Sequence, residues 1–409
     1  MNKKKIINDP VYGFISIPTE LVFDLIQHPY FQRLRYIKQL GMTHLVYPGA
    51  LHTRFHHALG AMHLMGMAIE TLRNKGHQIS NHEEEAIIIA ILLHDVGHGP
   101  FSHALEESIV EGISHEDISA MLMQKLNVQF GGRLTTAIEI FKGGYHREFL
   151  HQLVSGQLDM DRMDYLNRDS FFTGVSEGVI SSDRIIKMLN VKDDQIVVEE
   201  KGIYSVEKFL IARRLMYWQV YLHKTVIAAE QLLSRILRRS RELAVSGETL
   251  FTTPALSHFL KKPISRDAFM NEGHHLEAFA SLDDTDIMAA IKVWAGNEDP
   301  VLAKLCTDMV HRDLYKVDIT NEPPNKKFIE ELRWKAISRY GITEHDASYF
   351  VFDDTIRNNA YRPGDGDIRI LMKDGSIKDI TTASDNSNLE ALARTVKKYI
   401  LCYKKDLVL

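Results

Sequence analysis

One apolar run limits what this chain can fold into more than any other feature. Residues 86 to 93 are all alanine, isoleucine or leucine, and three glutamates stand directly before them. Acidic side chains stabilise the first turn of a helix, and a helix that is apolar on every side has to be surrounded by other elements. We therefore expect residues 83 to 93 to form a central buried helix, which ends at the glycines and proline of residues 97 to 100.

The remaining sequence is mostly helical in pattern. Apolar side chains recur every three or four positions from residue 53 to 73, and a long helix is expected over about 206 to 245. Residues 191 to 206 suggest a small hairpin. Residues 348 to 382 are strand-like, and a final helix is expected over about 388 to 403. The expected fold class is therefore mainly α, with a small mixed α/β subdomain at the C-terminus.

The same pattern divides the chain into four parts. We expect an N-terminal arm over residues 1 to 20, a helical core over 21 to 245, a helical extension over 246 to 345 and a C-terminal α/β subdomain over 346 to 409. No internal repeat is present, so repeat architectures are excluded.

Bulk composition excludes several classes of protein. The 409 residues carry a formal net charge of −5, so no general positive field exists to gather nucleic acid. The two cysteines, Cys306 and Cys402, make neither a disulfide framework nor a thiolate metal site. No secretion signal follows Met1, and the longest apolar run is far shorter than the about 20 residues that span a bilayer. We therefore expect a cytoplasmic protein without membrane association.

An adjacent histidine and aspartate, His94 and Asp95, follow the buried helix. Burying these side chains is costly unless they are paired or bind a metal ion. Their nitrogen and oxygen donors suit Zn, Fe, Mn or Ni, and Mg less well. His57 upstream and Asp161 downstream can complete a four-ligand site that leaves positions open for water and phosphate. Several other histidines are interpreted as surface or hydrogen-bonded residues, namely His77, His82, His146, His151, His274 and His275.

Several short motifs make the sequence resemble a known family. Its motifs, in order, are Asn8-Asp9-Pro10, residues 31 to 41, Thr53 to His57, His94 to His103 and Asp159 to Tyr165. Over roughly residues 5 to 224 they are similar to those of the HD-domain phosphohydrolases. The similarity is closest to the deoxynucleoside triphosphate (dNTP) triphosphohydrolases, including the catalytic core of the vertebrate SAM-and-HD-domain enzyme. The resemblance implies an HD-domain helical core, a divalent metal cofactor, and hydrolysis of dNTPs to deoxynucleoside and inorganic triphosphate.

The resemblance also implies roles for individual residues. The implied metal ligands are His57, His94, Asp95 and Asp161, the set that the order of motifs already suggests. The implied catalytic residues are His98, His103, Glu106 and His115, with the proton donor left open between His115 and His103. The implied substrate-binding residues are Arg54, Arg162, Tyr165 and Arg213 for the phosphates, Gln39, Asp169 and Tyr221 for the sugar, and in addition Leu40 and Tyr217. Among these, Tyr221 corresponds to the tyrosine that packs under the sugar and leaves no room for a 2′-hydroxyl.

Regulation and assembly also follow from the resemblance. An activator nucleotide site is implied at Lys5, Asn8, Gln32 and Arg35. Gln27 stands where the vertebrate enzyme has the acidic residue that reads guanine, and this difference argues against activation specific to guanine. A homo-oligomer, either dimer or tetramer, is expected by the same analogy.

Two alternatives stay open. The metal motif would also serve an HD phosphohydrolase that acts on another nucleotide or phosphate ester. A nucleotide-sensing or nucleic-acid-binding regulator with a structural metal is the second alternative, and basic clusters at residues 238 to 241 and 326 to 327 could give weak binding of single-stranded nucleic acid. Such binding would weaken steeply with salt, because phosphate contacts release counterions.

Overall fold

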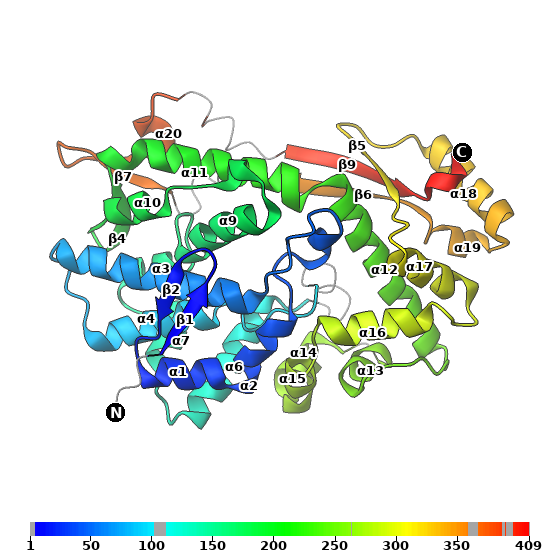
Figure 1. Cartoon of the computed structure of the whole chain (residues 1–409), viewed down its shortest axis with the longest axis horizontal. Coiled ribbons are helices and arrows are strands. Elements are labelled where there is room, and N and C mark those ends of the chain that lie inside the picture. The colour runs from blue at the N-terminus through cyan, green and yellow to red at the C-terminus, as the bar shows by residue number, and fades with distance from the viewer. Residues whose placement is uncertain are drawn as a thin grey trace.

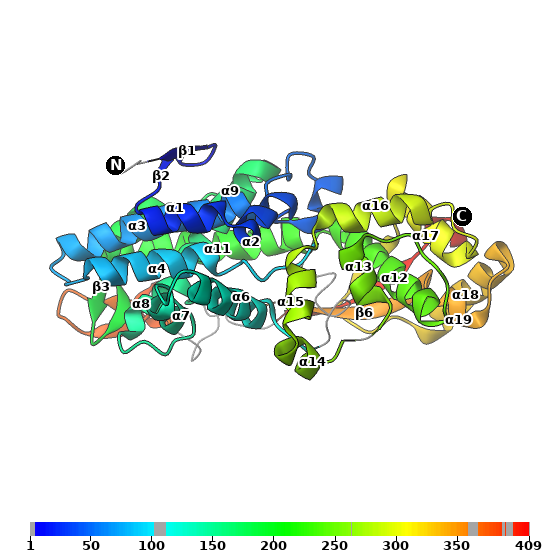
Figure 2. The ribbon, with the colours of Figure 1, turned by 90° about the horizontal axis from the view of Figure 1, so that it is seen from below.

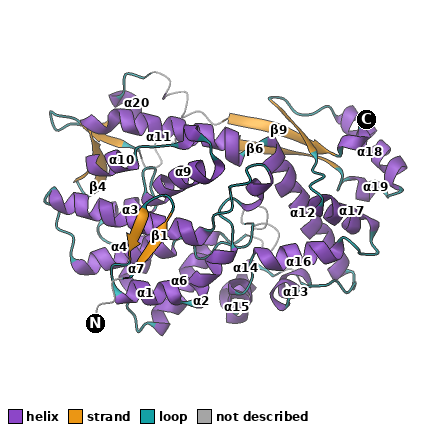
Figure 3. Ribbon diagram, viewed as in Figure 1, coloured by secondary structure: helices purple, strands orange, loops and turns teal. Residues whose placement is uncertain are grey.

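The structure is a computed structural model of the chain, and it describes residues 5–101, 112–262, 264–358, 367–386, 389 and 396–408. The molecule is elongated, with the first half of the chain at one end and most of the remainder at the other (Figure 1). Helices dominate, and the strands form only small sheets among them (Figure 3). The predicted fold class, a mainly α core with a small mixed α/β part, is confirmed.

The N-terminal lobe, defined here as the described residues from 5 to 223, contains the arm and the helices around the apolar run. Its elements are β1 (Ile6–Asp9), β2 (Gly13–Ser16), α1 (Glu20–Gln27), α2 (Pro29–Gln32), η1 (Arg33–Tyr36), η2 (Gly41–Leu45), α3 (Arg54–Asn74), α4 (Asn81–Leu93), α6 (His115–Gln129), α7 (Thr135–Phe141), α8 (Glu148–Val154), α9 (Met160–Thr173), η4 (Ser176–Gly178), α10 (Ser182–Met188), β3 (Leu189–Lys192), β4 (Gln195–Glu199), η5 (Glu200–Gly202), α11 (Ile203–Met216) and the π-helix η6 (Tyr217–Tyr221).

The C-terminal lobe, defined as the described residues from 224 to 358 and 396 to 408, begins with one long helix. Its elements are α12 (Lys224–Val245), α13 (Pro254–Leu260), α14 (Arg266–Asn271), α15 (Gly273–Ala280), α16 (Asp284–Trp294), α17 (Pro300–Val310), β5 (Lys316–Thr320), α18 (Lys326–Tyr340), α19 (Glu344–Ala347), β6 (Val351–Asn358), β9 (Val396–Tyr403) and η7 (Lys405–Leu407). Between β6 and β9 the chain also forms β7 (Arg369–Leu371), β8 (Ile377–Asp379) and α20 (Ile380–Ala383).

Two sheets connect distant parts of the sequence. One has the strand order β3-β4-β7-β8, and β4 pairs with β7 in parallel through Val198 and Ile370. The β7–β8 hairpin therefore returns to the N-terminal lobe, beside α10 and α11 (Figure 1). The other sheet has the order β5-β9-β6 and is antiparallel. Both sheets cross the domain boundary expected near residue 345, and the four-part division itself stays a prediction.

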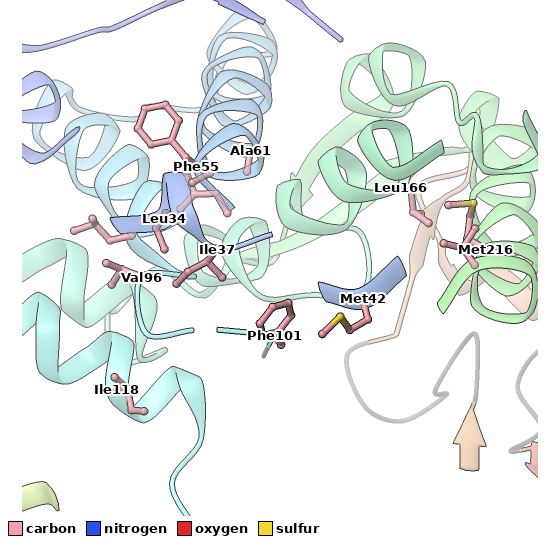
Figure 4. Packing of buried hydrophobic residues seen from close by; sticks show 14 of the residues in the cluster. Leu34, Ile37, Met42, Phe55, Ala61, Val96, Phe101, Ile118, Leu166 and Met216 are labelled. Atoms are coloured by element: carbon pink, nitrogen blue, oxygen red, sulfur yellow. The ribbon is translucent and has the colours of Figure 1, made fainter. Parts of the chain in front are cut away.

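The apolar run forms the centre of the N-terminal lobe, as predicted. Residues 86 to 93 are all buried in α4, and α3 packs against both α4 and α9. The turned view shows α3 and α4 side by side (Figure 2). Ser80 and Glu83 cap the start of α4 reciprocally. Around this centre Leu34, Ile37 and Val96 fill one part of the core, and Met42 lies close to Phe101 (Figure 4).

Two expectations about elements were wrong. The final helix expected over 388 to 403 is in its last part the strand β9, which lies between β5 and β6. Its two adjacent lysines resemble a helix surface, but Tyr399, Ile400 and Tyr403 suit a central strand once partners are available. The helix expected over 206 to 245 is interrupted by η6 and restarts after His223, whose side chain caps α12.

Among the described residues, no helix combines the length and apolar character needed to cross a membrane.

Candidate active site

Three of the four predicted metal ligands converge from three helices. His57 Nε2 on α3 lies 3.1 Å from Asp161 Oδ1 on α9, and 3.4 Å from Nε2 of His94 at the end of α4. His94 Nε2 lies 3.5 Å from the same Asp161 oxygen. Ligand atoms about 2.1 Å from a common cation lie roughly 3.0–3.5 Å apart. The spacing of this group, which we call the His57–His94–Asp161 cluster, therefore fits one divalent metal ion.

The far nitrogen of each imidazole is occupied, which leaves the near nitrogen for a cation. His57 Nδ1 lies 2.7 Å from Asp164 Oδ2, and His94 Nδ1 lies 2.6 Å from the carbonyl oxygen of Ile91. These acceptors hold a proton on Nδ1, so Nε2 is the nitrogen that can offer a lone pair to a cation. Burial opposes the charged form of His57, but hydrogen bonds to Asp161 and Asp164 raise its pKa to about 10. A cation in the cluster would take the place of that proton.

Asp95, the fourth predicted ligand, lies at the edge of the cluster. Its Oδ1 is 3.3 Å from His94 Nε2 and 3.2 Å from His98 Nε2, and its Oδ2 accepts a 2.5 Å hydrogen bond from Arg54 Nη1. Burial opposes ionisation of Asp95, but the charges of His94 and Arg54 and a hydrogen bond from His98 hold its pKa well below the usual range. Asp95 therefore stays a carboxylate and also holds Arg54, a predicted phosphate contact, beside the cluster.

Two predicted catalytic histidines lie together. The rings of His98 and His115 are stacked with centroids 3.9 Å apart. Burial and the charge of Arg54 lower the pKa of His98 to about 3, so this imidazole is neutral. His115 is the first residue of α6 and is more exposed than His98. The other two predicted catalytic residues, His103 and Glu106, lie outside the described residues.

Gly97 allows α6 to approach the His94–His98 segment. A Cβ at this position would lie 2.3 Å from the backbone oxygen of His115 and 2.3 Å from the backbone nitrogen of Ser119. The Ser119 hydroxyl donates to the carbonyl of His94 over 2.7 Å and accepts from the backbone N–H of Gly97 over 2.9 Å. Glycine and serine thus join the start of α6 to the metal cluster.

The predicted sugar-binding residues also meet. The hydroxyl of Tyr221 donates to Asp169 Oδ2 over 2.7 Å, while the other oxygen of Asp169 lies 2.7 Å from His52 Nε2. The backbone N–H of Gln39 donates to the carbonyl of His52, which places Gln39 on the other side of the same histidine. Leu40, the next residue, is half-buried against the core. His52 therefore connects Gln39 with Asp169.

The predicted phosphate-binding side chains gather around three tyrosines. The ring centroids of Tyr221 lie 6.3 Å from Tyr165 and 5.2 Å from Tyr217, and the Arg213 guanidinium lies 5.9 Å from the Tyr217 ring. Burial raises the pKa of Tyr165, and the positive charges of Arg213 and Arg162 oppose this increase. One Arg162 nitrogen is already taken, because it donates to Asp159 and to the carbonyl of Gly156.

Several buried polar atoms of the predicted substrate-binding side chains lack a hydrogen-bond partner among the described residues. They are Gln39 Oε1, Arg162 Nε and Arg213 Nε. Arg33 Nε and Arg235 Nε share this property elsewhere, so the amide oxygen of Gln39 is the more informative atom. A buried acceptor without a partner costs free energy, and a polar ligand would remove that cost.

The predicted activator residues form two separate groups within this chain. Gln32 Oε1 accepts from Arg35 Nε over 2.8 Å, and the Arg35 guanidinium lies over Phe55. The Lys5 ammonium lies over Phe23, and Asn8 pairs with Phe14 in the β1–β2 hairpin. Within the described residues no hydrogen bond or ion pair joins the two groups, and the activator site stays a prediction.

Comparison with known proteins now identifies the family. The HD domain model matches residues 54–169, and the HD associated region model matches residues 180–253. A crystal structure titled phosphohydrolase, from Bacteroides thetaiotaomicron, is 54% identical, with a TM-score of 0.96, and the match covers 98% of this chain and 100% of that one. The chain belongs to the HD-domain phosphohydrolases.

Two further relatives of this HD-domain phosphohydrolase differ in coverage. The YwfO protein of Bacillus subtilis is 33% identical over 100% of this chain and 94% of its own length. The deoxynucleoside triphosphate triphosphohydrolase SAMHD1 homolog of Dictyostelium discoideum is 34% identical over 54% of this chain. That match spans 46% of the Dictyostelium protein. The predicted relationship to the dNTP triphosphohydrolases and the predicted divalent metal cofactor are confirmed at this level.

Sequence reasoning missed five residues that support the site. Asp164 orients His57, and Arg168 holds Asp164 through two hydrogen bonds. Ser119 fixes α6, and buried Arg33 donates to the carbonyls of Val96 and His98. His52 holds Asp169. A signal existed for Asp164 alone, since it lies four residues before an arginine on one helix face.

Proposed function

We propose that this HD-domain phosphohydrolase converts dNTPs to deoxynucleoside and inorganic triphosphate. The observation that carries the proposal is the assembly of Tyr221, Asp169, His52 and Gln39, which shares α9 with Asp161 of the metal cluster and adjoins Arg213 through Tyr217. A bare metal cluster would serve any phosphate ester, whereas this assembly suits a sugar next to a phosphate chain. The Dictyostelium relative is named for activity on deoxynucleoside triphosphates, which supports the same substrate class.

Each group of residues has a task in the proposed reaction. A divalent cation, when bound at the His57–His94–Asp161 cluster, lowers the pKa of a coordinated water and neutralises charge on phosphate oxygens. Arg54, held by Asp95, binds oxygens of the innermost phosphate, for which a guanidinium is well shaped. Arg213, beside Tyr217, neutralises charge further along the triphosphate.

The bond that breaks joins the innermost phosphorus to the sugar 5′-oxygen. The water oxygen bonds to that phosphorus and gives up a proton, and the deoxynucleoside departs through its 5′-oxygen, which needs a proton, while the phosphorus stays in the triphosphate. We assign that proton to an imidazole nitrogen of His115. The stacked His98 is neutral, so its ring does not repel a protonated neighbour. His103 stays an alternative donor.

The sugar is selected by shape and by hydrogen bonds. Tyr221 is fixed by Asp169, so its ring is held against the place we assign to the sugar and leaves no space for a 2′-hydroxyl. The 3′-hydroxyl donates a hydrogen bond to Asp169 and accepts one from the side-chain amide of Gln39. Both residues are positioned by the same buried histidine, which limits their freedom to accommodate a different sugar.

Product analysis tests the proposal. The purified protein is incubated with each dNTP, each NTP and each dNMP, with Mn²⁺ and Mg²⁺ in turn, and products are separated by ion-exchange chromatography. We expect deoxynucleoside and triphosphate in equal amounts from dNTPs alone. Stepwise release of orthophosphate, or turnover confined to dNMPs, would instead indicate another phosphate ester as substrate. His94→Ala should be inactive, while Asp24→Ala, on the exposed face of α1, should match the unchanged protein.

A further inference from the structure

A second group of histidines lies in the C-terminal lobe, on elements that contribute nothing to the proposed reaction. His258 belongs to the last turn of α13, while His274 and His275 belong to the first turn of α15. Ring centroids lie 4.9 Å apart for His258 and His275, 5.5 Å for His258 and His274, and 4.0 Å for His274 and His275. One nitrogen from each imidazole lies within 4.8 Å of the other two. Nothing in the sequence singled out His258, which is distant from the other two along the chain.

The protonation state of these imidazoles suits metal binding. His258 Nε2 lies 2.6 Å from His275 Nδ1, a hydrogen bond that two protonated rings could not make. A cation would replace the shared proton and move these two nitrogens to the separation of roughly 3.0–3.5 Å expected of two ligands. Neutral imidazole nitrogens are the usual ligands of zinc and of the neighbouring transition metals.

A glutamate lies next to two of these three histidines. Glu272 Oε2 lies 3.5 Å from His275 Nε2, on the side of the ring opposite His258, and 3.7 Å from His274 Nε2. A carboxylate on the far nitrogen of a ligating histidine orients the ring and makes it a better donor. Glu272 also offsets the positive end of α15, which would otherwise disfavour a cation there. The nearby Lys125 is paired with Glu277 instead.

We propose that His258, His274 and His275 form a second metal site, for a zinc-class transition-metal dication that ties α13 to α15. Three imidazoles with an open fourth position match the coordination of zinc with three histidines and one water. The site is separate from the His57–His94–Asp161 cluster, because no residue is shared. It therefore does not depend on the proposed dNTP activity.

The position of α15 gives the second site a structural purpose. Glu277 accepts a 2.8 Å hydrogen bond from Tyr30, and the ring of Phe279 lies 5.4 Å from the Arg33 guanidinium. Arg33 in turn donates to the carbonyls of Val96 and His98 in the segment that follows α4. A metal that fixes the start of α15 therefore stabilises the packing between the two lobes.

Metal counting tests the second site. The protein is stripped with a chelator, dialysed against excess Zn²⁺ and then against buffer, and bound zinc is measured by mass spectrometry. We expect two equivalents in the unchanged protein, one in His258→Ala/His274→Ala, one in His94→Ala, and none when all three substitutions are combined. The exposed His146→Ala is the matched control and should keep two. Loss of the second equivalent should also lower the melting temperature in zinc.

A single substitution separates loss of metal binding from misfolding. His274 is exposed, so His274→Ala should leave the melting temperature of the metal-free protein unchanged. It should weaken the second Zn²⁺ equivalent at least tenfold in a competition titration with a fluorescent chelator. Co²⁺ added to His94→Ala should give the strong visible absorption of a tetrahedral site, and His274→Ala should remove it. Two full equivalents of zinc in His258→Ala/His274→Ala would overturn the proposal.

Discussion

At the scale of single residues, the active site depends on partners that never reach the substrate. His57 is held by Asp164, His94 by a backbone carbonyl and Asp169 by His52. Each partner fixes a tautomer or an orientation, so these side chains lose little freedom when a substrate binds. The site is therefore built before its ligands arrive.

Tyr221 provides the sharpest test at this scale. Tyr221→Ala removes the ring that closes the sugar position, and the preference for dNTP over NTP, as a ratio of kcat/KM, should fall about 10–100-fold. Tyr221→Phe keeps the ring and removes only the hydrogen bond to Asp169, so it should keep most of the preference. Steady-state kinetics with dATP and ATP measure both. An unchanged ratio in Tyr221→Ala would remove Tyr221 from the sugar site.

Much of the site could be predicted at residue level, and its supports could not. Histidine and aspartate at the ends of successive helices already indicated convergence, and the structure brings His57, His94 and Asp161 together. Ser119 and His52 gave no such signal, because a serine or a histidine has many possible partners. Their roles follow only from contacts across 25 and 117 positions of the chain.

At the scale of elements, the close approach of α6 to the segment after α4 depends on Gly97. Gly97→Ala places a methyl group against backbone atoms that no side-chain rotation can move, so α6 must shift. We expect a loss of about 1–3 kcal/mol in the free energy of unfolding and a large fall in kcat, measured by urea unfolding and steady-state kinetics.

Gly66→Ala is the matched control for Gly97→Ala. Gly66 is half-buried on α3, and a Cβ there would meet nothing within 4 Å. Alanine is favoured over glycine within a helix by about 0.5–1 kcal/mol, so this variant should be slightly more stable and fully active. Equal effects of the two substitutions would contradict the close approach at Gly97.

Glu83, at the start of α4, leads us to predict how the stability of the protein depends on pH. Burial opposes ionisation of Glu83, but hydrogen bonds from Arg147 and Ser80 lower its pKa to about 2. An unfolded glutamate has a pKa of about 4.3, so the stabilisation is complete above that value and is lost as the pH falls toward 2. Glu83→Gln should cost about 2 kcal/mol at pH 7. The difference from the unchanged protein should shrink by pH 3 in urea unfolding; a difference independent of pH would contradict it.

Elements with a local signal were predictable, and those decided by distant partners were not. Capping by Ser80 and the apolar run define α4 within a few residues. β9 has no local signal that outweighs its lysines, because its strand character depends on β5 and β6. The interruption of the long helix at η6 also has no local breaker, since residues 217 to 221 contain neither glycine nor proline.

At the scale of the whole molecule, the N-terminal arm is connected to the metal cluster through buried charges. Asp9, at the end of β1, pairs with Arg168 over 2.8 Å. Arg168 holds Asp164, and Asp164 orients His57. Gly60 on α3 makes room for this chain of contacts, because a Cβ there would lie 1.9 Å from an Asp164 oxygen. The arm, α9 and α3 therefore share one network in which every charge is paired.

Removing Asp9 should affect both the arm and the metal. Asp9→Ala leaves buried Arg168 with Asp164 as its one carboxylate and removes the acceptor for the backbone N–H groups of Val11 and Tyr12. We expect a loss of about 2–4 kcal/mol in the free energy of unfolding, because breaking a buried ion pair leaves charge uncompensated. Arg168 would also draw more strongly on Asp164 and loosen its hold on His57, so Mn²⁺ affinity should fall by about tenfold. Urea unfolding and calorimetric Mn²⁺ titration measure the two effects, with Asp24→Ala as the matched control. Lower stability with unchanged Mn²⁺ affinity would show that the arm stabilises the fold without reaching the metal cluster.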